Sequence, residues 1–119
     1  GTRVALRDEH GDPLTYTNAE GEVVESTALV AGQLSSLYRK AEDALRDRQL
    51  KRRSTVLTAE ILNRQQLELI AACVLKWDLF DEERPVPCTK ENVITVLIAA
   101  PWIRADIEAA MADAARFLG

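Results

Sequence analysis

The chain has 119 residues, of which 47% are hydrophobic and 29% charged, and its net charge is −4. This composition is typical of one globular domain with a single core, spanning residues 1–119, and it excludes an intrinsically disordered tail. The acidic balance argues against nonspecific binding to nucleic acid. No apolar run reaches the ~18 residues that a membrane-spanning helix requires, so we expect no membrane span and no signal peptide.

The N-terminal segment, residues 2–32, has the alternation of β-strands. Val4 and Leu6 fall on one face of the first strand, and His10–Pro13 and Asn18–Gly21 have the composition of turns. The run from Glu22 to Val30 is rich in β-branched residues. We therefore expect a small N-terminal antiparallel β-meander of two or three strands, which must cover its apolar face with the helices that follow.

The apolar period becomes helical in the segment 35–118, where we expect a bundle of about four α-helices. The first predicted helix is capped by Ser35 or Ser36 and ends near Arg53, and its apolar stripe consists of Leu34, Leu37, Tyr38, Ala41 and Leu45. The second is capped by Thr58 and is expected to end at Trp77. Because its stretch from Leu67 to Leu75 is apolar on nearly every side, this helix should lie in the middle of the fold.

The last two predicted helices have clear starting signals. Thr89 caps a helix over residues 90–99, with Glu91 in the first turn, where a negative charge suits the helix dipole. Pro101 begins the final helix, since the first helical position does not need an N–H. The stripe of this final helix consists of Ile103, Ile107, Ala110, Met111 and Ala114. Strands followed by helices predict the α+β class.

The residue types that carry catalysis are scarce. His10 is the sole histidine and falls in a predicted turn, and Cys73 and Cys88 are expected to be reduced thiols within the fold. One histidine without a CxxC pair cannot supply a zinc site, and the acidic run over residues 78–83 lacks the alternating ligands of a calcium loop. We therefore expect no enzyme, no cofactor and no metal.

Binding to a partner is the function class that remains. The large aromatic residues Trp77 and Trp102 are interpreted as anchors of helix ends in the core, with a share in a partner-binding groove as the alternative. The stripe of the first helix is narrow and flanked by charges, which suits docking of another helix. The candidate partner-binding residues are Leu37, Tyr38, Ala41, Leu45, Trp77 and Trp102.

The single basic cluster consists of Arg46, Arg48, Lys51, Arg52 and Arg53. Phosphate contact is one interpretation, and complementing the dipole at a helix C-terminus is the other. No aromatic residues interleave with these cations, so the stacking needed for single-stranded nucleic acid is missing.

One stretch resembles a known family. Trp77, the segment Pro85-Val86-Pro87-Cys88-Thr89-Lys90-Glu91-Asn92-Val93 and Pro101 resemble the small tail assembly chaperones of long-tailed, siphovirus-type bacteriophages or prophages. Gly32–Arg39 adds a weaker likeness. The chain departs from the family at Phe80–Arg84, where a glycine-containing turn would be more comfortable.

The resemblance implies a non-enzymatic protein of the bacterial host cytoplasm that is absent from the mature virion. It would hold the long tape-measure protein soluble and help recruit tail-tube subunits, and it could self-associate; neither nucleic acid nor a membrane is an expected partner. Two alternatives stay open. One is a structural tail or head–tail joining protein, and the other is a small nucleic-acid-binding regulatory domain that uses the basic cluster.

Overall fold

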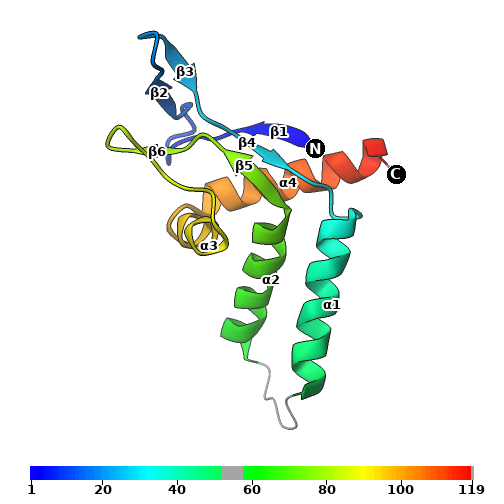
Figure 1. Cartoon of the computed structure of the whole chain (residues 1–119). Helices are drawn as coiled ribbons and strands as arrows, with labels where there is room; N and C mark the ends of the chain where they lie inside the picture. Colours follow the sequence, from blue (N-terminus) through cyan, green and yellow to red (C-terminus); the bar gives the residue numbers. More distant parts are fainter. Residues whose placement is uncertain (52–57, 119) are drawn as a thin grey trace.

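The computed structural model describes residues 1–51 and 58–118, with side chains as far as residue 113. In this part of the chain the helices are α1 (Ser36–Lys51), α2 (Ala59–Cys73), α3 (Lys90–Ala99) and α4 (Pro101–Leu118). The strands are β1 (Thr2–Ala5), β2 (Thr15–Thr17), β3 (Val23–Glu25), β4 (Thr27–Val30), β5 (Val74–Trp77), β6 (Phe80–Asp81) and β7 (Arg84–Pro85). N-terminal strands followed by four helices confirm the predicted α+β class (Figure 1).

The main sheet is antiparallel and has the order β1-β4-β5. Its central strand β4 places Ala28 opposite both Val4 and Trp77. The strands between β1 and β4 form a separate hairpin, β2–β3, which projects from one end of the molecule (Figure 1). The N-terminal strands therefore do not pair in chain order as a meander would, because β1 skips the β2–β3 hairpin to reach β4.

The prediction that α2 extends to Trp77 is wrong. Helix α2 ends at Cys73, and the next four residues form the edge strand β5, so the segment 35–118 is not helical throughout. Strand β4 decides this boundary, since Ala31 donates its backbone N–H to the carbonyl of Cys73 and pairs this end of the segment. Val30 pairs with Val74 and Leu29 with Lys76, so Leu75 is the extra residue of a β-bulge.

The predicted helix starts are confirmed by their caps. Ser35 Oγ accepts a hydrogen bond from the N–H of Tyr38 at 3.3 Å, so of the two candidates Ser35 caps α1. Thr58 and Thr89 accept in the same way at the starts of α2 and α3, each at 3.2 Å. Three parts of the sequence predictions, Arg52, Arg53 and the side chain of Ala114, lie outside the described residues.

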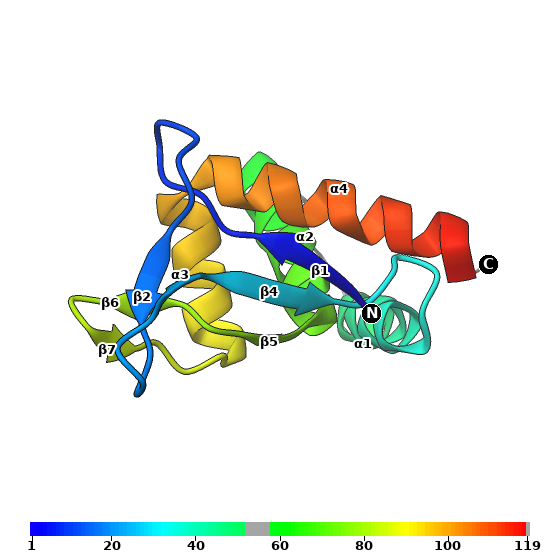
Figure 2. The ribbon, with the colours of Figure 1, turned by 90° about the horizontal axis from the view of Figure 1, so that it is seen from above.

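The core lies between the sheet and the helices. Helix α4 runs along the inner face of β1 and β4, and α2 and α3 pack beside it (Figure 2). Leu6 is buried and Val4 half-buried on this face, as their alternation predicts. The other largest hydrophobic side chains that are fully buried are Val30, Leu67, Cys73, Val93, Ile94, Leu97 and Ile107.

The hairpin β6–β7 turns through two residues that have left-handed backbone conformations. Glu82 has a φ of 48° and Glu83 a φ of 67°, although neither is glycine. This is the stretch where the sequence suggested that a glycine would be more comfortable. A side chain at positive φ costs about 1–2 kcal/mol per residue, so the turn stores strain.

We expect the combined substitution Glu82→Asn and Glu83→Gly to raise the free energy of unfolding by about 1–2 kcal/mol, because Asn-Gly suits a two-residue hairpin turn. Urea unfolding of both proteins measures the difference. Gly21→Ala is a control that should change stability in the opposite direction. Gly21 has a φ of 80° and open space around it, so alanine there should lower the free energy of unfolding by about 1 kcal/mol. An Asn-Gly variant that is less stable than the parent would contradict the strain assigned to this turn.

Candidate functional site

Helices α1 and α2 form a hairpin that extends away from the sheet, called here the helical arm (Figure 1). Every residue of α1 is described, and none of them is buried. The base of α2 belongs to the core through Leu67 and Ile70, whereas no residue of its first half is buried. In that first half, Asn63 Oδ1 accepts a hydrogen bond from Nη1 of Arg104 on α4 at 2.8 Å. The arm is therefore a two-helix layer whose apolar residues are only partly covered.

The predicted stripe of α1 is confirmed in part. Tyr38, Ala41 and Leu45 are half-buried, while Leu37 is 38% exposed. Tyr38 packs against the core at the base of the arm, where its burial, followed by the nearby Glu42 carboxylate, raises the pKa of its hydroxyl above the usual 10.0. Tyr38 therefore contributes packing where the arm joins the core.

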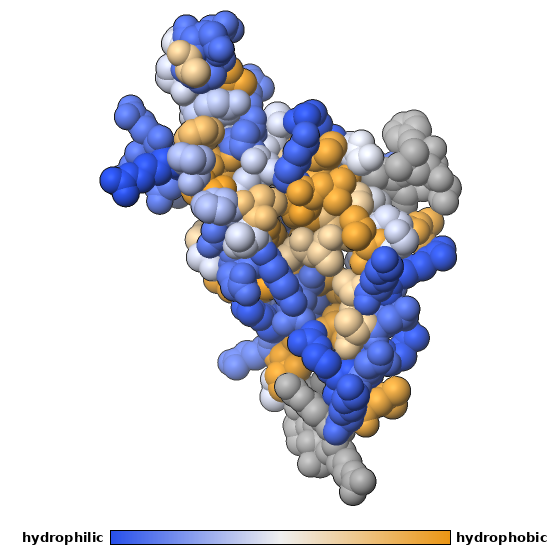
Figure 3. Space-filling view, viewed as in Figure 1, coloured by the Kyte–Doolittle hydropathy of each residue, from blue (hydrophilic) through white to orange (hydrophobic). Residues whose placement is uncertain are grey.

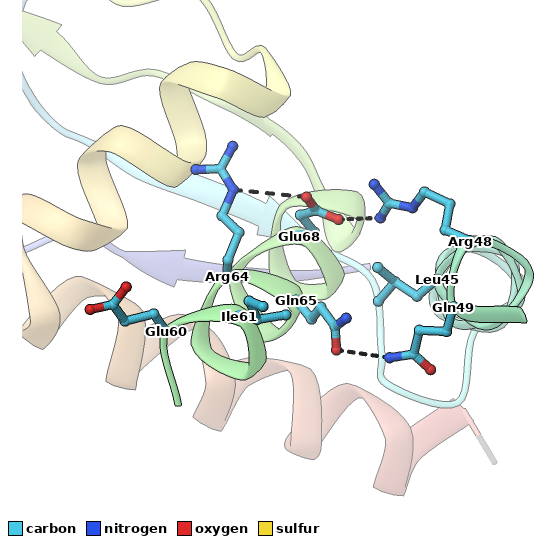
Figure 4. Close-up of a pocket in the computed structure, with 8 residues that line it drawn as sticks. All are labelled: Leu45, Arg48, Gln49, Glu60, Ile61, Arg64, Gln65 and Glu68. Carbon is cyan, nitrogen blue, oxygen red and sulfur yellow. Dashed lines mark hydrogen bonds and ion pairs between the residues drawn. The ribbon is translucent and has the colours of Figure 1, made fainter. Parts of the chain in front are cut away.

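A groove of about 280 Å³ lies between the distal halves of the two helices (Figure 4). Leu45 from α1 and Ile61 from α2 supply its apolar surface, and both are half-buried. Its other lining residues are polar: Arg48, Gln49, Glu60, Arg64, Gln65 and Glu68. Both signs of charge are present around this narrow apolar strip.

The polar residues at one end of the groove hold the two helices together. The Glu68 side chain, only 15% exposed, accepts from Nη2 of Arg48 on the other helix at 2.5 Å. Nε of Arg64 lies 3.8 Å from the second carboxylate oxygen, so two arginines converge on one acid (Figure 4). Gln49 Nε2 donates to Gln65 Oε1 at 3.2 Å. These contacts set the register of the arm, and they pair one member of the basic cluster, Arg48, whose side chain stays 54% exposed.

Further apolar side chains on the arm are exposed to solvent. Leu50 is 77% exposed and Leu62 48% exposed. Figure 3 shows a larger apolar area over the ends of β4 and β5 and the adjoining tops of α1 and α2. In these elements the exposed apolar side chains include Leu37 and Leu75, the residue of the bulge. Apolar surface therefore continues from the sheet onto the arm.

Sequence reasoning missed the part of the arm that α2 supplies. Ile61 and Leu62 lie in the amphipathic first half of α2, and the sequence predicts that this helix as a whole lies in the middle of the fold. The usable signal was the contrast between the polar first half of α2 and the apolar stretch from Leu67 onward, because only the latter can lie in the core.

The two tryptophans lie away from the arm. Trp77 is half-buried in β5, and its indole N–H donates to the carbonyl of Val86 at 2.7 Å, which fastens the segment before α3. Trp102, 36% exposed at the start of α4, donates to the carbonyl of Arg7 at 2.8 Å. The six predicted partner-binding residues are thus divided among the arm, the core and a second groove beside Trp102.

The structure also shows the surroundings of the two cysteines and of the residue types that bind metals. Cys73 is buried and Cys88 half-buried, both as free thiols, and burial raises the pKa of each. Within residues 1–51 and 58–118, no group of three or more His, Cys, Asp or Glu side chains is arranged to hold a metal ion. In the same ranges, no helix combines the length and the apolar character needed to cross a membrane.

Comparison with known proteins adds no relative: no protein-family model, curated protein or solved structure matches this chain.

Proposed function

We propose that this protein is a phage tail assembly chaperone that binds the tape-measure protein through the helical arm and helps recruit tail-tube subunits. The observation that carries the proposal is the incomplete packing of the arm, where α1 has no buried residue and Leu50 and Leu62 are exposed. The resemblance of Trp77 and the segment from Pro85 to Pro101 to this family supplies the identity of the client.

The arm has the surface that an amphipathic helix requires. A two-helix hairpin with a narrow apolar groove can be completed by a third helix that lays its apolar stripe between α1 and α2. The charges of Arg48, Glu60, Arg64 and Glu68 around the groove would meet the polar flanks of such a helix. A tape-measure protein is long and largely helical, so weak binding at each site would gain strength through many copies along one client.

Binding of a tape-measure fragment by arm variants tests this proposal. We expect the combined substitution Leu50→Glu and Leu62→Glu to weaken binding by about tenfold or more, because charges replace exposed apolar side chains of the arm that adjoin the groove residues Gln49 and Ile61. The matched control is Val23→Glu with Ile98→Glu, which changes two residues of 73% and 59% exposure outside the arm. Isothermal titration calorimetry measures the affinity, and circular dichroism checks that each variant is folded. Equal affinities of the two double variants would contradict the proposed site.

The composition of purified virions separates this proposal from a structural role. A chaperone acts in the host cytoplasm and leaves before maturation, so mass spectrometry should find no stoichiometric amount of this chain in finished particles. Its presence there in fixed stoichiometry would instead identify a tail or head–tail joining component. If the protein instead binds nucleic acid, the affinity should fall steeply as the salt concentration rises. The ion pair between Arg48 and Glu68 argues against this alternative, because it already neutralises one cation of the basic cluster.

A further inference from the structure

A second apolar groove, called here the Trp102 groove, lies across the molecule from α1, in the region of β6 and α3 in Figures 1 and 2. It has a volume of about 510 Å³ and is formed by the turn after β1, by β6 and the residues around it, and by the junction of α3 and α4. The apolar side chains that line it include Leu14, Leu79, Val86, Val96, Trp102 and Ile103. Segments from three parts of the chain therefore build one apolar surface.

The uncharged polar side chains of the lining donate hydrogen bonds to carbonyl groups of the protein itself. The indole N–H of Trp102 donates to the carbonyl of Arg7 at 2.8 Å. Asn92 Nδ2 donates to the carbonyl of Pro87 at 2.9 Å, and the hydroxyl of Thr95 donates to the carbonyl of Glu91 at 2.9 Å. A site for a small polar ligand needs convergent polar groups that are free to bind it. The groove offers apolar contact instead.

The charges around the groove are mainly negative. Asp8, Glu9 and Asp81 contribute three carboxylates, and the single cation of the lining is Arg7. Arg7 is neutralised by a bidentate pair with Asp106, in which Nε and Nη2 lie 3.0 Å and 2.5 Å from the two carboxylate oxygens. The local field at the groove therefore favours a cation beside an apolar group.

We propose that the Trp102 groove docks a segment of a partner protein that presents a bulky apolar side chain flanked by Lys or Arg. The apolar side chain would pack against Trp102, a rigid aromatic residue of the type that dominates binding energy at interfaces. The flanking cations would pair with the carboxylates of Asp8, Glu9 and Asp81, which select against acidic segments. This inference does not rest on the proposed chaperone function, because the groove is separate from the helical arm.

Nuclear magnetic resonance of the full chain tests the docking with two synthetic helical peptides. Both carry one Phe and one Leu as anchors; one has four flanking Lys and the other four flanking Glu. The two indole N–H signals report the site, since Trp102 lines the groove and Trp77 does not. We expect the Lys peptide to shift the Trp102 signal, leave the Trp77 signal in place and bind at least tenfold more tightly than the Glu peptide.

Charge variants of the protein provide the matched control. Glu9→Lys with Asp81→Lys should weaken binding of the Lys peptide by about tenfold, because attraction becomes repulsion at the edge of the groove. Glu20→Lys with Glu22→Lys changes the net charge equally at the exposed β2–β3 turn and should leave the affinity unchanged. Asp8 is not substituted in either variant, since its carboxylate accepts hydrogen bonds from the backbone N–H groups of His10 and Asp12.

Three results would overturn the proposal. Equal binding of the Lys and Glu peptides would remove the role of charge. A Trp102 signal that shifts with protein concentration alone would show that a second copy of this chain occupies the groove. N-acetylphenylalanine amide that binds as tightly as the Lys peptide would show a pocket for a small apolar molecule.

Discussion

Replacing Ile107 with alanine should lower the free energy of unfolding by about 3–4 kcal/mol. Ile107 is completely buried on α4, in the core formed by the sheet with α2, α3 and α4. Alanine there removes buried methyl groups and leaves a cavity that the packed neighbours cannot fill. Since a domain of this size is stable by roughly 5–15 kcal/mol, this loss is a large fraction of the total. Urea unfolding followed by circular dichroism measures it.

Leu45→Ala on the helical arm is the control for this experiment. Leu45 is half-buried, and α1 contributes no buried residue, so the loss should be about 1 kcal/mol. Hydrogen exchange should place the effect mainly in α1 and the first half of α2, because the arm can loosen while the core stays folded. Equal losses for the two variants would contradict the division between core and arm.

Asp78→Ala should lower the free energy of unfolding by about 2–3 kcal/mol. The Asp78 carboxylate accepts hydrogen bonds from the hydroxyl of Tyr16, at 3.1 Å, and from the backbone N–H of Thr27. Tyr16 also stacks on Phe80, with ring centroids 4.5 Å apart. Asp78 thus joins the β2–β3 hairpin, β4 and the segment before β6, and its loss leaves the Thr27 amide without this acceptor.

Two conservative variants separate the contributions of the Tyr16 bond and the Thr27 bond to stability. Tyr16→Phe removes only the hydroxyl and keeps the stacked ring, so it should lower stability by about 1 kcal/mol. Asp78→Asn keeps a carbonyl oxygen that can accept from Thr27, so its effect should fall between the other two. Urea midpoints of the three variants measure the order. If Asp78→Ala were no more destabilising than Tyr16→Phe, the bond to Thr27 would carry no net stability.

The parts of the fold that follow from neighbouring residues were predictable. Thr58 and Thr89 cap helices because their hydroxyls reach N–H groups three residues away, which requires only local geometry. Pro101 starts α4 for a similar reason. Comparison with the resembled family marked Phe80–Arg84 as a stretch where a glycine would be more comfortable, and the structure has two residues of positive φ there.

The boundary at Cys73 could not be predicted in this way. An apolar run from Leu67 to Leu75 suits a buried helix and a buried strand equally, and periodicity alone does not separate them. Strand β4, more than forty residues earlier in the chain, supplies the partner that turns Val74–Trp77 into a strand. Because of the same nonlocal pairing, Trp77 lies in the edge strand of a sheet and not at the end of a helix.

The candidate sites were likewise predictable from the sequence only in part. The apolar stripe of α1 was readable from spacing, but the Trp102 groove combines a turn, a short strand and a helix junction that are distant in the chain. The amino-acid order alone determined the α+β class and the helix caps, because these depend on composition and on contacts within one helical turn. Only the tertiary structure decided which strands pair, which apolar residues remain exposed and which charges surround each groove, because those properties arise when distant segments compete for the same buried surface.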